Sequence, residues 1–160
     1  GSGSAGRRQV LLAEFFIGPR KTILKPDELL VEIVIPKQNL GKPAHFLKSG
    51  LRKGQALALV NVCASLWVDW DKRVFVAPRI ALGAVAPTVI RTLQTEAYLE
   101  GRAITPEAMT EAGRIAVDDA KPISDFRASA EYRRDLIAVL TRRALENAYA
   151  QAQAKRNQEI

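Results

Sequence analysis

The stretch that decides the fold runs from Ala44 to Val85, AHFLKSGLRKGQALALVNVCASLWVDWDKRVFVAPRIALGAV. Two apolar runs flank a polar turn at residues 69–73. In the first run every second residue is apolar: Ala58, Val60, Val62, Ala64, Leu66, Val68 and Trp70. In the second run the alternation places these residues on one side: Val74, Val76, Ile80, Leu82 and Ala84. A period of two on both sides of a turn predicts a long antiparallel hairpin with one face against a core.

The residues before the hairpin predict one further strand. Apolar side chains alternate from Leu29 to Ile35, with Glu32 on the opposite side. Pro36 cannot donate to a strand ladder and is expected to end this strand. The sheet is therefore predicted to contain three or four antiparallel strands.

The residues after the hairpin predict about three helices, over 89–99, from 105 to about 120, and from about 129 past 148. In the second helix Thr105 is the predicted N-cap and Pro106 the first helical residue. The last helix is expected to bury a stripe of Tyr132, Leu136, Val139, Leu140, Arg143 and Ala144. Strands followed by helices predict an α+β fold, in which the antiparallel sheet packs against a small bundle of C-terminal helices.

The length of 160 residues fits one domain. Residues 1–12 begin GSGSAG, which lacks the preceding strand that a dinucleotide-binding loop needs, and are predicted to be a flexible lead. Residues 13–150 form the predicted domain, and residues 151–160 are predicted to be a frayed tail.

The 24 Lys and Arg residues against 17 Asp and Glu give a net charge of +7, which favours acidic partners. The cations are scattered and do not interleave with aromatic residues, so no nucleic-acid partner is predicted. No apolar stretch reaches the ~18 residues that a membrane span needs. A single cysteine argues against a disulfide framework and indicates a cytoplasmic location.

Few residues are suited to catalysis. His45 is the only histidine and Cys63 the only cysteine, so neither a histidine cluster nor a cysteine-rich site can hold a metal. A Cys63–His45 couple is disfavoured because Cys63 lies within a predicted strand. No catalytic or metal-binding residue is assigned. Asp125 and Arg127 are expected to tie a loop to the start of the last helix, or else to form a subunit contact.

Lys48 is the strongest candidate for binding a ligand. It lies at the end of a short strand and precedes a loop that contains Gly50, Arg52 and Gly54. A lysine in this position could donate hydrogen bonds to a polar, electron-rich ligand edge.

Several segments together identify a resemblance. Residues 46–52 (FLKSGLR), 79–88 (RIALGAVAPT), 122–125 (PISD) and 127–133 (RASAEYR) occur in this order. In order and spacing the chain resembles, over about residues 7–148, the C-terminal domain of the FAD subunits of molybdenum hydroxylases. This family includes the medium subunit of carbon monoxide dehydrogenase and the flavin part of xanthine dehydrogenase.

The resemblance implies a role in electron transfer. Electrons would pass from a molybdopterin subunit, through two 2Fe-2S clusters of an iron–sulfur subunit, to FAD and then to NAD or another acceptor. The resemblance places Lys48 beside the flavin ring and makes Ser49, Arg52 and Gln55 cofactor-binding residues of the loop that flanks it. A cation beside the ring would raise the flavin's reduction potential.

The resemblance also implies that this chain holds only part of the flavin site. In the family, glycine-rich loops of an N-terminal domain bind the FAD phosphates, and no such loops are found here. We therefore expect this chain alone to bind FAD weakly or not at all, and to be inactive outside an FAD-dependent oxidoreductase complex. The alternative is a non-enzymatic scaffold domain of the same fold that packs against an iron–sulfur subunit. The sequence does not indicate the substrate, the physiological acceptor or the oligomeric state.

Overall fold

The computed structural model describes residues 6–52, 54 and 56–159, without the side chain of residue 159. The chain divides into two compact units, Gly1–Gly41 and Lys42–Ile160. The larger unit carries the hydrophobic core, together with Lys48 and the loop that follows it.

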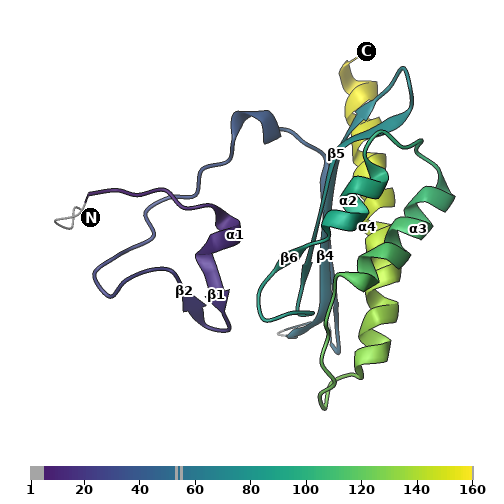
Figure 1. Ribbon diagram of the computed structural model, residues 1–160. Coiled ribbons are helices and arrows are strands. Elements are labelled where there is room, and N and C mark those ends of the chain that lie inside the picture. The colour runs from purple at the N-terminus through teal and green to yellow at the C-terminus, as the bar shows by residue number, and fades with distance from the viewer. Residues whose placement is uncertain (1–5, 53, 55, 160) are drawn as a thin grey trace. The chain divides into compact units, whose positions relative to one another are not determined.

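The larger unit is an antiparallel sheet covered by helices on one face (Figure 1). The strands lie in the order β3-β4-β5-β6: Ala44–Gly50, Ala58–Asp69, Val74–Gly83 and Ile90–Arg91. The helices follow in the chain: α2 (Leu93–Leu99), α3 (Pro106–Asp118) and α4 (Ala130–Glu159). The predicted α+β fold and the predicted β4–β5 hairpin are confirmed.

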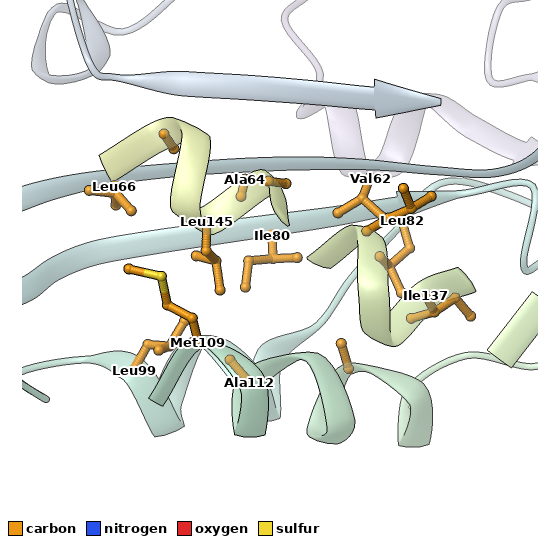
Figure 2. Packing of buried hydrophobic residues seen from close by; sticks show 14 of the residues in the cluster. Val62, Ala64, Leu66, Ile80, Leu82, Leu99, Met109, Ala112, Ile137 and Leu145 are labelled. Carbon is orange, nitrogen blue, oxygen red and sulfur yellow. The ribbon is translucent and has the colours of Figure 1, made fainter. Parts of the chain in front are cut away.

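The core lies between the sheet and the helices. Alternate side chains of β4 are fully buried, among them Val60, Val62 and Leu66. Figure 2 shows side chains of β4 and β5 meeting those of all three helices. Because burying each large aliphatic side chain stabilises the fold by about 1.5–3 kcal/mol, this interface dominates the stability of the unit.

In β5 the predicted set of buried residues is partly wrong. Ser65 pairs with Arg79 but Trp67 pairs with Val76, so β5 contains an irregularity of register around Ala77. Ala77 has a φ of 46°, and its N–H donates to the Glu100 carboxylate. The bulge reverses the alternation, so Phe75 is fully buried while Val76 is only half-buried.

On α4 the buried stripe is rotated from the predicted one. Its buried residues are Arg133, Ile137, Leu140, Thr141, Ala144, Leu145, Ala148 and Ala152. Tyr132, expected in the stripe, is 51% exposed. The sequence pattern alone predicts Arg133 beside the stripe, because an arginine is seldom buried unless it is paired. The helix also continues through the predicted tail, where Ala152 is buried, and fraying there stays a prediction.

The predicted helix 89–99 starts later than expected. Ile90 and Arg91 form β6 and pair with Leu82 and Ala81 of β5, so the helix begins only at Leu93. At the next helix, Thr105 accepts a hydrogen bond from the N–H of Ala108, which confirms the predicted N-cap.

The smaller unit has little regular structure. It contains α1 (Leu12–Phe15), β1 (Phe16–Gly18), β2 (Lys21–Thr22) and the 3-10 helix η1 (Lys37–Asn39). The strand predicted from Leu29 to Ile35 is wrong. No described strand pairs with this stretch, and its apolar side chains are exposed, with Leu29 at 79% and Ile33 at 72%. The strands that the large sheet has in addition to the β4–β5 hairpin are instead β3 and β6.

Gly113 on α3 marks a close approach to α4. A Cβ atom at this position would lie 2.4 Å from the backbone oxygen of Ala138. Glycine to alanine inside a helix otherwise gains about 1 kcal/mol, but a backbone oxygen cannot rotate away, so the helices would have to separate. We expect Gly113→Ala to lower the free energy of unfolding by about 1–2 kcal/mol in urea titrations. The exposed neighbour substitution Arg114→Ala should stay within about 0.5 kcal/mol, and equal stability of the two variants would contradict the close packing.

Candidate functional site

Lys48 lies on the face of the sheet that the helices leave open. Exposed and half-buried residues alternate along the edge strand β3, so successive side chains point to opposite faces. Leu47 packs against the core, and His45 Nδ1 lies 3.1 Å from the Gln151 amide of α4. Phe46, 57% exposed, and Lys48 therefore share the opposite, open face. This contact with α4 indicates a structural role for His45.

The Lys48 amine lies at the mouth of the loop between β3 and β4. Its Nζ donates a hydrogen bond to the backbone oxygen of Ala56, at 3.2 Å, across the base of this loop. The side chain is otherwise exposed, so the amine keeps donors for a ligand. The strand continues to Gly50, two residues beyond the end predicted at Lys48, so Ser49 belongs to β3 and not to the loop.

The strand register determines which residues surround Lys48. Lys48 pairs with Asn61 of β4, and Asn61 pairs with Gly83 of β5. One step along the same face, Cys63 pairs with Ala81. The open face beside the amine is thus built from small residues and one carboxamide. Burial raises the pKa of the Cys63 thiol, so at neutral pH Cys63 is protonated and is a poor nucleophile.

The other predicted cofactor-binding residues are placed differently. Ser49 is half-buried and alternates to the face opposite Lys48, so the structure does not bring its hydroxyl to the amine. Arg52 is exposed in the loop. Gln55 lies outside the described residues. Flavin contacts by these three residues stay predictions.

The sequence alone does not place Asn61 and Gly83 beside Lys48. Their proximity to Lys48 follows from the register of three neighbouring strands. The hairpin pattern alone predicts only on which face of the sheet a side chain lies. One local signal is available for Asn61. The even-numbered residues of β4 are all apolar, so the polar, odd-numbered Asn61 is predicted to lie on the opposite face of the strand.

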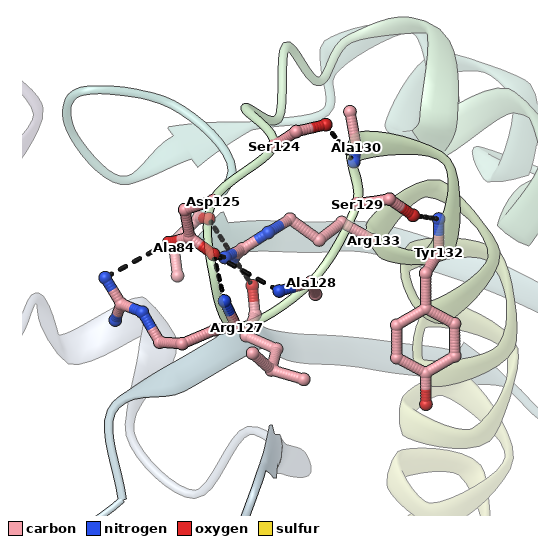
Figure 3. Close-up of polar contacts among 10 residues, drawn as sticks. Ala84, Ser124, Asp125, Arg127, Ala128, Ser129, Ala130, Tyr132 and Arg133 are labelled. Atoms are coloured by element: carbon pink, nitrogen blue, oxygen red, sulfur yellow. Dashed lines mark hydrogen bonds and ion pairs between the residues drawn. The ribbon is translucent and has the colours of Figure 1, made fainter.

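A buried ion-pair cluster fixes the end of the sheet next to the loop (Figure 3). Arg133 of α4 donates to the backbone oxygen of Leu59 and, at 2.9 Å, to Asp125. Asp125 also accepts hydrogen bonds from the N–H groups of Arg127 and Ala128. The predicted tie between loop and helix is confirmed, and Arg133 is its unpredicted member. Because Leu59 is the second residue of β4, the cluster holds the backbone close to the point where the loop returns to the sheet.

The charge state of Asp125 follows from these contacts. Burial favours the neutral carboxyl, but the hydrogen bonds from Arg127 N–H, Arg133 and Ala128 N–H outweigh it and hold the pKa of Asp125 below its ordinary value. The carboxylate is therefore ionised at neutral pH and compensates the buried guanidinium of Arg133.

The open face presents groups that can form hydrogen bonds with a polar ligand and pack against it. It offers an exposed amine, a carboxamide, the Phe46 ring and small neighbours. It does not offer a phosphate site, since no glycine-rich loop leads from a strand into a helix N-terminus within the described ranges. Within the same ranges no three metal-ligating side chains lie together, and none of the helices is both long and apolar enough to cross a bilayer.

Comparison with known proteins gives consistent relatives. Residues 45–148 match the family described as the CO dehydrogenase flavoprotein C-terminal domain. The carbon monoxide dehydrogenase medium chain of Hydrogenophaga pseudoflava is 35% identical over 92% of this chain and 50% of its own length. The xanthine dehydrogenase FAD-binding subunit of Escherichia coli O157:H7 is 31% identical over 94% of this chain and 51% of its own length.

Solved structures agree with the fold. A chain of carbon monoxide dehydrogenase from Hydrogenophaga pseudoflava superposes with a TM-score of 0.84 at 33% identity, over 93% of this chain and 51% of that one. A chain of quinoline 2-oxidoreductase from Pseudomonas putida 86 gives a TM-score of 0.81 at 32% identity, with the same coverage. The chain spans about half the length of the relatives it matches.

Proposed function

The chain belongs to the family of CO dehydrogenase flavoprotein C-terminal domains, and from this premise we propose that it forms one wall of the flavin site in a molybdenum hydroxylase. Electrons from the iron–sulfur and molybdopterin subunits would reach FAD at this wall and leave to NAD or another acceptor. The bound flavin would supply the redox chemistry. The domain would bind the polar edge of the ring and control access to it.

The observation that carries this proposal is the position of Lys48. Its amine is exposed on the open sheet face, whereas the neighbouring Leu47 packs toward the helices. A positive charge about 4 Å from a developing negative charge stabilises it by about 1 kcal/mol in water and about 4 kcal/mol near a protein surface. Lys48 would thus favour electron acceptance by a ring placed against this face.

The remaining contacts to FAD would come from outside this chain. The pyrophosphate needs a cluster of backbone N–H groups, and the described residues provide none on the open face. We therefore expect the chain alone to bind FAD weakly or not at all. The exposed apolar stretch 29–35 is consistent with a surface that the remaining half of the flavoprotein, or a partner subunit, would cover.

A titration of FAD tests the proposal. The chain is combined with the half of the flavoprotein that its relatives carry in addition, and FAD binding is followed by quenching of flavin fluorescence. We expect Lys48→Ala to weaken FAD binding by about ten-fold, because a charge-assisted hydrogen bond contributes about 1.5–3 kcal/mol. Lys72→Ala, at the exposed tip of the β4–β5 turn, is the matched control and should bind like the wild type.

Two outcomes would count against the flavin wall. If Lys48→Ala and Lys72→Ala bind FAD equally, the amine does not contact the ring. If the combined protein does not bind FAD but still associates with an iron–sulfur subunit, the chain is a scaffold domain of the same fold instead.

A further inference from the structure

We propose that Asn61 is a second flavin-binding residue of this wall, and that the absence of a side chain at Gly83 holds its carboxamide in place. This inference rests on the proposed function, because it concerns the same ligand. Asn61 lies in β4, so this contact to the flavin would come from outside the loop between β3 and β4.

The geometry around Gly83 is unusually close. A Cβ atom at Gly83 would lie 2.3 Å from Asn61 Oδ1 and 3.0 Å from both Cγ and Nδ2. The whole carboxamide of Asn61 therefore lies over the Gly83 backbone, in the space that any other residue would fill. Gly83 has no positive φ, so the close approach, not the backbone conformation, explains the glycine.

The carboxamide is placed where it can meet a ligand. Asn61 is directly opposite Lys48 in the strand register, and side chains so paired have Cβ atoms about 4.5–5.5 Å apart. Within the described part of the chain no hydrogen bond involves the Asn61 side chain, although it is half-buried. Its donor and its acceptor are therefore both available to a ligand on the open face.

The two side chains offer complementary hydrogen-bonding groups. The Lys48 amine can only donate, whereas the Asn61 carboxamide can donate and accept. The polar edge of a flavin ring alternates carbonyl acceptors with an N–H donor, so a lysine alone would leave the N–H without a partner. A buried unpaired N–H costs binding free energy, and Asn61 would remove this cost.

The test measures FAD affinity of the combined flavoprotein by fluorescence quenching, together with the visible absorbance of the bound flavin. Asn61→Leu keeps the shape over Gly83 but removes both hydrogen-bonding groups, and we expect FAD binding to weaken by about five- to ten-fold. Gly83→Ala forces the carboxamide away and should weaken binding by a similar factor. The double variant should bind FAD no more weakly than either single variant, because both changes remove the same contact.

Ser65→Ala provides the matched control. Ser65 lies on the same face of β4, farther from the loop, opposite Ala44 and Arg79. It should leave FAD affinity and the absorbance of the flavin unchanged. Urea unfolding of each variant identifies any that fails to fold, and Asn61→Leu keeps the inference testable if Gly83→Ala does fail.

The failure of this inference can be distinguished from failure of the proposed function. If Lys48→Ala weakens FAD binding but Asn61→Leu leaves affinity and absorbance unchanged, the proposed function is supported and the role of Asn61 is overturned. If neither variant has an effect, both are overturned. If the effects of Asn61→Leu and Gly83→Ala simply add in the double variant, Gly83 does not hold the carboxamide.

Discussion

Replacing Phe75 by alanine is expected to lower the free energy of unfolding by about 3–5 kcal/mol, the usual cost of removing a fully buried aromatic side chain. Val76→Ala should cost only about 1 kcal/mol, because Val76 is half-buried. Urea titration of the full chain would measure the free energy of unfolding of both variants. The pair tests the β5 bulge directly, since the strand without a bulge would place Val76 in the core and Phe75 outside it.

The contact that holds the bulge gives this prediction its control. Glu100 accepts the hydrogen bond of the Ala77 N–H, and Ala77 has a positive φ. Glu100→Ala leaves every core side chain in place and should cost about 1 kcal/mol, the value of one hydrogen bond. If Val76→Ala proves more destabilising than Phe75→Ala, the register around Ala77 differs from the one described.

Removing the Arg133 side chain is expected to lower the free energy of unfolding by about 2–4 kcal/mol, because it breaks hydrogen bonds from a charged donor to Leu59 and to Asp125. Arg133 is only 3% exposed. The substitution leaves the Leu59 backbone oxygen without the guanidinium that donates to it, and it leaves Asp125 with the Arg127 guanidinium, at 3.1 Å, as its remaining ion-pair partner. Arg133→Ala should be compared with Arg134→Ala, an exposed neighbour on α4, which should stay within about 0.5 kcal/mol. Similar stabilities of the two variants would contradict a buried ion pair.

The pH dependence of stability should follow the Asp125 carboxyl. Its pKa is below the ordinary value in the folded chain, so its contribution is present above the unfolded pKa of about 4 and is lost as pH falls through the folded pKa. The stability gap between wild type and Arg133→Ala should therefore be constant above about pH 5 and narrow below it. A gap that widens in acid would show that Arg133 is not paired with Asp125.

The sequence predicts those parts of the fold that depend on neighbouring residues in the chain. The even-numbered apolar residues of β4 and the Thr105–Pro106 helix start are local signals, and both are confirmed. The alternation from Leu29 to Ile35 is equally regular, yet it forms no strand, because a strand also needs a partner that no local pattern supplies.

The remaining differences have the same origin in long-range contacts. The reversal at Ala77 depends on Glu100, 23 residues away, and the burial of Arg133 depends on Leu59, 74 residues away. At the site, Lys48 could be predicted as an exposed strand residue before a loop. Asn61 and Gly83 could not, because their proximity to Lys48 follows only from the register of three strands.

The reduction potential of FAD bound to the combined flavoprotein is the measurement that tests the flavin wall most directly. Lys48→Met keeps an unbranched apolar side chain of nearly the same length and removes the ammonium group with its charge and hydrogen-bond donors. We expect this variant to have a potential lower than that of the wild type by about 30 mV, which for a two-electron couple corresponds to about 1.4 kcal/mol of lost interaction. A potential equal to that of the wild type, with FAD fully bound, would show that the Lys48 amine does not act on the flavin.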